Sequence, residues 1–385
     1  MFDEKFKRKL NIKKEQGLYR DPVIIENRFG KFAQINGAKI LSFASNDYLG
    51  ISELDISKDI VGRNFKKYGT SSSSSRLVSG NYSIINQAED EYASYFGFES
   101  AIFYPSGYQA NLGLLSSLFD SSDSVFFDKH IHASAVKGLE GSKAKLTSYN
   151  HSSFSHLEKR LSKNDAQNKA VVTESLFSMD GDILDVGILN VLKQKYNFLS
   201  IVDESHAFGV LGDKGKGVAK GVSDVAVGTF GKAFGLFGAF VLLPSLIKEY
   251  LLNFSSPLIY STTLPEAHAA SALEFLEIIE NSDERRDHLK RMCTLLKAEL
   301  TKAGFKVEGD AHIISIFVGD EERATQISSM MLKSGLLIFP ARYPTVHKGK
   351  AILRIGMTAL HNEEDLEKLI AELKRSFDKC NVSIM

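Results

Sequence analysis

The stretch Leu199-Ser-Ile-Val-Asp-Glu-Ser-His206 is a short apolar run that ends in charged and polar side chains. Similar β-rich runs lie on both sides of it, and stretches with a helical pattern separate them. These runs are Ala101-Ile-Phe-Tyr104, Ser124-Val-Phe-Phe127, Ala170-Val-Val-Thr173, Val225-Ala-Val227 and Ala239-Phe-Val-Leu-Leu243. Strands that alternate with helices are typical of a mainly parallel, doubly wound sheet, so the sequence predicts an α/β fold.

The two ends of the chain have patterns of their own. Residues 1 to about 20 carry apolar residues at helical spacing and predict a helix that packs one side onto something larger. A long helical pattern covers about 266–305, and short strand candidates then alternate with helices to the end. We therefore expect an N-terminal helix and segment at 1–45 that packs on the small domain, a large domain at 46–285 and a small C-terminal α/β domain at 286–385.

The composition excludes several classes of protein. With 43% hydrophobic and 24% charged residues, the chain is typical of folded proteins. Forty-seven basic residues balance 47 acidic ones, which argues against nucleic acid or an anionic membrane as a partner. The two cysteines, Cys293 and Cys380, lie far apart, and no apolar run is long enough to span a bilayer. These features predict a cytoplasmic protein without a disulfide framework.

Polar side chains follow several of the predicted strands. Asp203 and His206 follow the apolar run that begins at Leu199, and Glu174 and Ser178 follow the run that begins at Ala170. Parallel α/β sheets bind ligands at the carboxyl ends of their strands. This edge of the sheet is therefore the predicted site.

Lys232 is the only ionisable residue in the stretch Val225-Ala-Val-Gly-Thr-Phe-Gly-Lys-Ala-Phe-Gly-Leu-Phe-Gly-Ala-Phe240. Burial lowers the pKa of an ammonium group, and such a lysine is suited to form a Schiff base. The alternative is a surface lysine on a glycine-rich turn, as most lysines are exposed.

The stretch Tyr104-Pro-Ser-Gly-Tyr-Gln-Ala-Asn111 predicts a strand end that passes into a helix capped by Ser106. Backbone N–H groups at such a helix start can bind a phosphate, although an ordinary cap has the same pattern. A Schiff-base lysine, a carboxylate for a pyridinium nitrogen and a phosphate-binding helix are together the parts of a pyridoxal 5'-phosphate (PLP) enzyme.

His130 and His132 form a His-x-His pair after the strand at 124–127. Such a pair can bind a metal, or one imidazole can lie flat against an aromatic cofactor. Because no further His/Cys cluster stands at ligand spacing, we predict no metal site.

The chain resembles the α-oxoamine synthases, a family of fold-type I PLP enzymes, over nearly its whole length. The matching segments are Gly17-Leu-Tyr-Arg20, Ser45-Asn-Asp-Tyr-Leu-Gly50, Arg76-Leu-Val-Ser-Gly80, Ser106-Gly-Tyr108, His132-Ala-Ser134, Val172-Thr-Glu-Ser-Leu-Phe-Ser-Met-Asp-Gly-Asp182, Val202-Asp-Glu-Ser-His206, Gly209-Val-Leu-Gly212, Thr229-Phe-Gly-Lys232, Ile259-Tyr-Ser-Thr262, Tyr343-Pro-Thr-Val346 and Leu353-Arg-Ile355. The resemblance implies a large domain with a mainly parallel sheet and a smaller C-terminal domain.

The same resemblance implies roles for individual residues. Lys232 would hold PLP as a Schiff base, and Asp203 would pair with the ring nitrogen. His132 would stack on the ring and help place the substrate, and His206 would bond the phenolic oxygen of the ring. The residues implied around the phosphate or close to the cofactor are Ser106, Gly107, Tyr108, Thr229 and Ser178. Those implied for substrates are Arg354 and Asn46 for the amino acid's carboxylate and Arg20 and Thr345 for the acyl path. Ser261 and Thr262 match a segment that reaches the neighbouring subunit's site, which implies a homodimer.

The implied reaction is a decarboxylative condensation of L-alanine with a pimeloyl thioester of coenzyme A or acyl-carrier protein, a step of biotin biosynthesis. A sister reaction of glycine with acetyl-CoA is the nearest alternative, and a non-catalytic binding protein of the same fold is a second.

One segment departs from the family pattern. Five serines, Ser71 to Ser75, stand where relatives have glycines, and no histidine occurs between Gly80 and Lys129. Either this is an ordinary surface loop, or it borders the acyl entrance and changes how the thioester is received.

Overall fold

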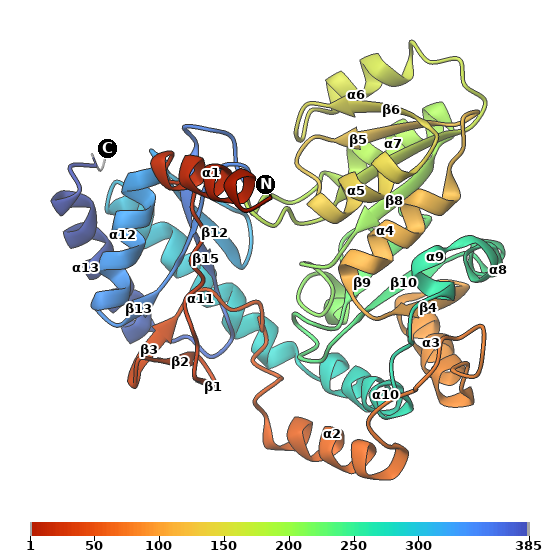
Figure 1. Ribbon diagram of the computed structural model, residues 1–385, viewed down its shortest axis with the longest axis horizontal. Coiled ribbons are helices and arrows are strands. Elements are labelled where there is room, and N and C mark those ends of the chain that lie inside the picture. Colours follow the sequence, from red (N-terminus) through yellow and green to blue (C-terminus); the bar gives the residue numbers. More distant parts are fainter. Residues whose placement is uncertain (1, 383–385) are drawn as a thin grey trace. The chain divides into compact units, whose positions relative to one another are not determined.

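The computed structural model describes residues 2–382 and divides the chain into two compact units (Figure 1). The larger unit consists of residues 51–178 and 183–286. The smaller unit consists of the residues up to 50, the short segment 179–182 and the residues from 287 onward. The domain limits predicted at 45/46 and 285/286 remain a prediction.

The larger unit is built on a seven-stranded sheet with the order β4-β10-β9-β8-β7-β5-β6. Its strands are β4 (Ser100–Tyr104), β5 (Ser124–Asp128), β6 (Lys145–Tyr149), β7 (Lys169–Glu174), β8 (Leu199–Asp203), β9 (Val225–Thr229) and β10 (Ala239–Leu243). Every pair from β9 to β6 is parallel, and only β10 runs antiparallel to its two neighbours. The predicted mainly parallel α/β sheet is therefore confirmed.

Helices connect and cover these strands. They are α2 (Asp55–Tyr68), α3 (Ser83–Phe96), α4 (Gly107–Leu118), α5 (Ala133–Gly141), α6 (Phe154–Leu161), α7 (Val186–Tyr196), the 3₁₀ helix η1 (Asp213–Gly215), α8 (Ser245–Phe254), α9 (Ser256–Ile259) and α10 (Glu266–Glu280). The helical pattern predicted for 266–305 is interrupted after α10, and α11 (Asp283–Lys302) begins as a second helix.

The sheet is buried on both faces, as parallel sheets are. Ala170, Val172 and Ile201 pack with α4 and α5 residues in one apolar cluster, whereas Val171 and Val202 belong to a second cluster with α6 and α7 residues. Aromatic rings fill the region around β10, where a Cβ on Gly228 would lie 2.3 Å from the Phe240 ring. Side chains that alternate along each strand thus fix the register and the direction in which each strand end points.

The smaller unit holds two four-stranded sheets. One has the order β11-β12-β15-β14, formed by β11 (Val307–Glu308), β12 (Ile313–Gly319), β14 (Phe339–Ala341) and β15 (Ala351–Gly356). The other joins β1 (Asn27–Phe29), β2 (Phe32–Ile35) and β3 (Ala38–Ser42) to β13 (Leu336–Leu337). Helices α11, α12 (Glu321–Lys333) and α13 (Glu363–Lys379) complete this unit.

Helix α1 (Phe2–Glu15) forms where the sequence predicted it. None of its residues is buried, and Phe2, Phe6 and Leu10 are exposed, so the packing predicted for its apolar side remains a prediction. Among the helices of residues 2–382, none combines the length and the apolar character that a membrane crossing requires.

Candidate active site

Glu174 ends β7 and Asp203 ends β8, and the two residues are paired in register on neighbouring parallel strands. Thr229 ends β9, the next strand of the sheet. The structure therefore brings together, at one edge of the sheet, three of the strand ends that the sequence singled out. This is the edge at which α/β sheets bind their ligands.

Lys232 lies in the turn between β9 and β10, where its carbonyl accepts a hydrogen bond from the Gly235 N–H at 3.0 Å. The residue is half-buried, which distinguishes it from the exposed lysine that was the alternative interpretation. Its ammonium group is also near enough to His132 and Glu174 to influence the pKa of each. Lys232 therefore belongs to the same group of residues as the strand ends.

Asp203 has two hydrogen-bond donors. The Ser205 N–H donates to Oδ1 at 2.9 Å, and the Asn111 side-chain amide donates to Oδ2 at 2.8 Å. Asn111 lies on α4, one turn after the helix start, and the sequence analysis assigned it no role. Asn111 could have been recognised from its position four residues after Gly107, because residues three or four apart share a helix face.

His132 is the N-cap residue of α5. Its Nδ1 accepts a hydrogen bond from the Ser134 N–H at 3.3 Å and lies 2.7 Å from the Ser134 Oγ. Desolvation by the surrounding protein lowers the pKa of His132, and the Lys232 charge also lowers it, while Asp203 acts in the opposite direction. The lowered pKa favours the neutral imidazole, and the Ser134 N–H that points at Nδ1 favours the tautomer with its proton on Nε2.

The start of α4 lies beside the end of β9, since a Cβ on Gly107 would be 4.0 Å from the Thr229 Cβ. The Ser106 Oγ accepts from the Gln109 N–H at 3.2 Å, which confirms the predicted cap. The first turn of α4 holds no acidic residue, so its N–H groups and helix dipole favour an anion. Tyr108 follows as an exposed side chain.

Two further residues of the predicted cofactor set lie in the loops after β7 and β8. His206 is buried in the loop after β8, and Ser178 is half-buried in the loop after β7. The backbone N–H of Ser178 donates to the Glu174 carboxyl group. Thr262 is exposed and pairs with Ser75 in an isolated β-bridge.

The predicted substrate residues other than His132, which are Arg20, Asn46, Thr345 and Arg354, lie in the smaller unit. Arg354 is buried on β15, and its guanidinium donates to the Asn46 Oδ1 at 3.3 Å and to the Tyr48 hydroxyl at 3.4 Å. The two residues predicted to bind a carboxylate are thus adjacent.

Arg20 and Thr345 are both exposed. The segments that carry them are linked by Arg342, which donates to the carbonyls of Gly17 at 2.5 Å and Tyr19 at 3.4 Å. No sequence motif pointed to Arg342.

His130 does not join His132. Its ring stacks on His151 with 4.0 Å between the ring centroids, and His151 is paired with the buried Asp128 at 3.0 Å. The two histidines of the His-x-His pair therefore have separate surroundings.

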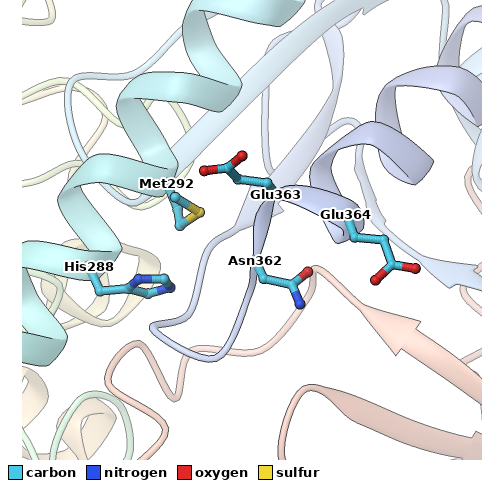
Figure 2. A pocket seen from close by; sticks show the side chains of 5 residues that line it. All are labelled: His288, Met292, Asn362, Glu363 and Glu364. Carbon is cyan, nitrogen blue, oxygen red and sulfur yellow. The ribbon is translucent and has the colours of Figure 1, made fainter.

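A separate cavity of about 360 Å³ in the smaller unit contains none of the predicted site residues. Figure 2 shows the residues that line it, which are His288, Met292, Asn362, Glu363 and Glu364. Asn362 and Asp365 form a capping box there, so backbone N–H groups at the start of α13 are already bonded and acidic side chains surround them. This cavity does not suit an anion.

A family model described as Aminotransferase class I and II matches residues 38–373, and the chain belongs to this family. It is similar to the 8-amino-7-oxononanoate synthase of Lysinibacillus sphaericus, with 37% identity over 97% of this chain and 98% of that protein. It is also 35% identical to the enzyme of the same name from Geobacter sulfurreducens, over 94% of this chain and 95% of that protein. The resemblance to the α-oxoamine synthases is thereby confirmed.

Solved structures give the same family. Serine palmitoyltransferase of Sphingomonas wittichii is 27% identical with a TM-score of 0.92, over 99% of this chain and 98% of that one. A structure of SPT with its PLP internal aldimine is 26% identical with a TM-score of 0.89, over 94% of each chain. The 8-amino-7-oxononanoate synthase of Francisella tularensis is 30% identical with a TM-score of 0.77, over 89% of this chain and 99% of that one. The predicted fold-type I architecture is confirmed.

The family and the PLP-containing neighbours indicate PLP as the cofactor. The residues at the sheet edge fit this group. Lys232 supplies an amine, Asp203 a carboxylate, and the α4 start beside Thr229 a phosphate site without acidic residues.

Proposed function

We propose that the protein catalyses the decarboxylative condensation of L-alanine with a pimeloyl thioester, which gives 8-amino-7-oxononanoate and carbon dioxide and frees the carrier. The observation that carries this proposal is the grouping of Lys232, Asp203 and His132 at the carboxyl end of the parallel sheet. The length over which relatives match also supports it, because the synthase of L. sphaericus is similar to 97% of this chain.

Lys232 has two tasks in this proposal. Its Nζ would hold the cofactor covalently, and the amine, when free, would remove the proton from Cα of alanine. When bound, PLP supplies an electron sink for the pair left at Cα. The half-buried position of Lys232 suits both tasks, since the amine is held near the reacting carbon and partly shielded from water.

Asp203 and His132 orient the cofactor in this proposal. The Asp203 carboxylate would pair with the pyridine nitrogen and keep its proton in place, and its two donors fix the direction of the carboxylate. The imidazole of His132 would stack on the ring, and its lowered pKa favours a form that adds no positive charge. His206 would bond the phenolic oxygen, and Ser178 would stand close to the cofactor. The residues at the phosphate are Ser106, Gly107, Tyr108 and Thr229.

The substrates are held by residues of the smaller unit. Arg354 and Asn46 bind the carboxylate of alanine, and their adjacency supports a shared site. Arg20 and Thr345 line the path of the acyl chain. Arg342 keeps the segments that carry them together.

A homodimer completes this proposal. Leu77, Val78 and Tyr260 are 66%, 78% and 78% exposed in the single chain, and apolar side chains so exposed suit contact with a second copy. Thr262 lies in the same region through its bridge to Ser75, and we assign it to the neighbouring subunit's phosphate site. Sedimentation that shows a fully active monomer would refute the dimer.

The cytoplasm is the proposed compartment. Cys293 and Cys380 are both free thiols, which suits a reducing environment.

Complementation tests the shared site. Lys232→Ala mixed with Thr262→Ala should regain part of the wild-type activity, because each mixed dimer contains one site with neither defect. Mixtures no more active than the separate variants would contradict shared sites.

Two alternative activities differ only in substrates. The sister reaction uses glycine and acetyl-CoA, and the solved neighbours of TM-score 0.92 and 0.91 are named serine palmitoyltransferases. The higher identity to the named 8-amino-7-oxononanoate synthases, 37% against 27%, supports alanine and a pimeloyl group. A non-catalytic binding protein would have no need of Lys232 beside Asp203. Coenzyme A release with each pair of substrates tests these alternatives.

A further inference from the structure

A chain of buried polar groups connects Asp203 to His132. Asn111 Nδ2 lies 2.8 Å from the Asp203 Oδ2 and 3.1 Å from the Ser134 Oγ, and the Ser134 Oγ lies 2.7 Å from the His132 Nδ1. Asn111 is 4% exposed and Ser134 is 0% exposed, so water does not compete for the bond between them, whereas Asp203 is half-buried and His132 is exposed. Four residues from α4, α5 and the end of β8 thus form one hydrogen-bonded line.

The direction of each bond follows from the donors that are present. A carboxylate only accepts, so the side of Asn111 that faces Asp203 is the NH₂ group. The second hydrogen of that group points to the Ser134 Oγ, which leaves the serine hydrogen for the His132 Nδ1. The Ser134 N–H also donates to Nδ1, at 3.3 Å. The two bonds that Ser134 donates to Nδ1 therefore require an unprotonated Nδ1.

Reversal of the line would leave the Ser134 hydroxyl hydrogen without a partner in it. If Nδ1 carried a proton and donated to the Ser134 Oγ, that oxygen would accept from both Nδ1 and the Asn111 amide, and the buried serine hydrogen would need another acceptor. The amide cannot rotate to relieve this, because its oxygen would then face the Asp203 carboxylate at 2.8 Å. Asn111 thus determines which group donates and which accepts in the hydrogen bonds from Asp203 to His132.

We propose that Asn111 is a positioning residue that, through Ser134, holds His132 as the neutral Nε2–H tautomer and ties this state to the orientation of Asp203. The proposal rests on the proposed function in that His132 is taken to lie on the cofactor ring. It assigns roles to two residues on α4 and α5 that lie between the two groups which orient the cofactor.

The hydrogen bond from Ser134 also affects the pKa of His132. A hydrogen bond donated to Nδ1 stabilises the neutral imidazole and lowers the pKa of His132. Loss of that donor raises this pKa, so the imidazole becomes charged at a higher pH. One hydrogen bond contributes about 1 kcal/mol, which corresponds to a shift of about 0.7 pH units.

The test uses the PLP-loaded enzyme with ¹⁵N-labelled histidine, and it follows the His132 ring nitrogens by NMR as the pH is lowered. The variants are Asn111→Ala, Ser134→Ala and the double variant. Ser116→Ala is the matched control, because its hydroxyl on the same helix donates to the Leu112 carbonyl at 2.6 Å and lies outside the line. The absorbance of the bound cofactor is recorded in parallel, since neither readout needs a substrate.

We expect an unprotonated Nδ1 in the wild type and a rise of about 0.7 pH units in the His132 pKa for Ser134→Ala. Asn111→Ala should raise the pKa in the same direction, and the double variant should raise it no further than Ser134→Ala, because Asn111 acts on His132 through Ser134. Ser116→Ala should leave the titration unchanged.

A protonated Nδ1 in the wild type would overturn the proposal. It would also be overturned if the His132 pKa shifted in Ser134→Ala but stayed unchanged in Asn111→Ala. If Asn111→Ala does not fold, Ser134→Ala decides the outcome, since an unchanged His132 pKa in that variant also overturns it. Failure of the condensation reaction would affect the proposed function and leave the outcome of these titrations untouched.

Discussion

The Glu174 carboxyl group accepts a hydrogen bond from the backbone N–H of His132, with 2.5 Å between Oε1 and N. Glu174 is 3% exposed and stands beside Asp203 on the neighbouring strand. It therefore holds the backbone of His132, while Ser134 bonds the imidazole of the same residue. Neither the sequence pattern nor the family resemblance assigned Glu174 a role.

Burial raises the pKa of Glu174 well above its usual value, the Asp203 charge raises it further, and the Lys232 ammonium acts against both. A carboxyl group whose pKa is raised by folding binds its proton more tightly in the folded state. Its contribution to stability is therefore complete at low pH and is lost as the pH rises from the unfolded value through the folded one. Wild-type stability should fall over that window, whereas Glu174→Gln should remove this fall.

Melting temperatures of both proteins between pH 4 and 9, at saturating PLP, measure this difference. Glu249→Gln, at an exposed glutamate, is the control and should keep the wild-type dependence of the melting temperature on pH. Parallel stability curves for wild type and Glu174→Gln would show that Glu174 is ionised throughout.

Lys232→Ala should abolish turnover, with a loss of more than about 1,000-fold, because it removes both the Schiff-base amine and the group that takes the Cα proton. The visible absorbance of the covalently bound cofactor should vanish while the circular dichroism remains that of a folded protein. Lys220→Ala, at an exposed lysine, is the control. Product formation by Lys232→Ala without added amine would contradict the assignment.

Asp203→Asn should keep the cofactor bound but reduce kcat by about 100-fold or more, because an amide supplies no negative charge to the pyridine proton. It should also disturb Asn111, whose amide donates to Asp203 at 2.8 Å. Steady-state rates within a few-fold of wild type would show that Asp203 has another role.

The serine segment 71–75 should divide into two kinds of residue. Ser72 is 3% exposed and its hydroxyl donates to the Thr263 carbonyl at 2.7 Å, so Ser72→Ala should destabilise the protein by about 1 kcal/mol. Ser73 is exposed at a φ of +53°, and Ser73→Gly should stabilise by about 0.5 to 1 kcal/mol because glycine adopts this conformation without strain. Urea unfolding of both variants measures these changes. If both variants shift the urea midpoint in the same direction, the predicted difference between Ser72 and Ser73 is wrong.

The same variants address the acyl entrance. If the segment receives the thioester, Ser73→Gly should change KM for the acyl substrate and leave KM for alanine nearly unchanged. Equal effects on both substrates, or on neither, would return the segment to the status of an ordinary loop.

The sequence predicted the central strands well because each is an apolar run bounded by turn residues. It did not predict β6, whose Lys145, Leu146 and Ser148 are exposed at the sheet edge and break the apolar pattern. The short strands β1 to β3 were also missed, since they are three to five residues long and only partly buried.

The site was predictable only as far as the strand ends and the motifs reach. Asp203 and Lys232 follow strands directly, so their position at one edge of the sheet follows from topology. Asn111 and Asp203 are 92 positions apart in the chain, and their contact depends on how α4 lies against the sheet. Roles that depend on such packing, as for Asn111 and Ser134, required the three-dimensional structure.

Coenzyme A release from the purified, PLP-loaded protein should be measured with three substrate pairs: L-alanine with pimeloyl-CoA, glycine with acetyl-CoA and L-serine with palmitoyl-CoA. We expect alanine with pimeloyl-CoA to give a kcat/KM at least about tenfold above either other pair, a preference worth about 1.4 kcal/mol in the transition state, with equimolar carbon dioxide and 8-amino-7-oxononanoate. A higher kcat/KM for glycine with acetyl-CoA or for serine with palmitoyl-CoA would contradict the proposed function.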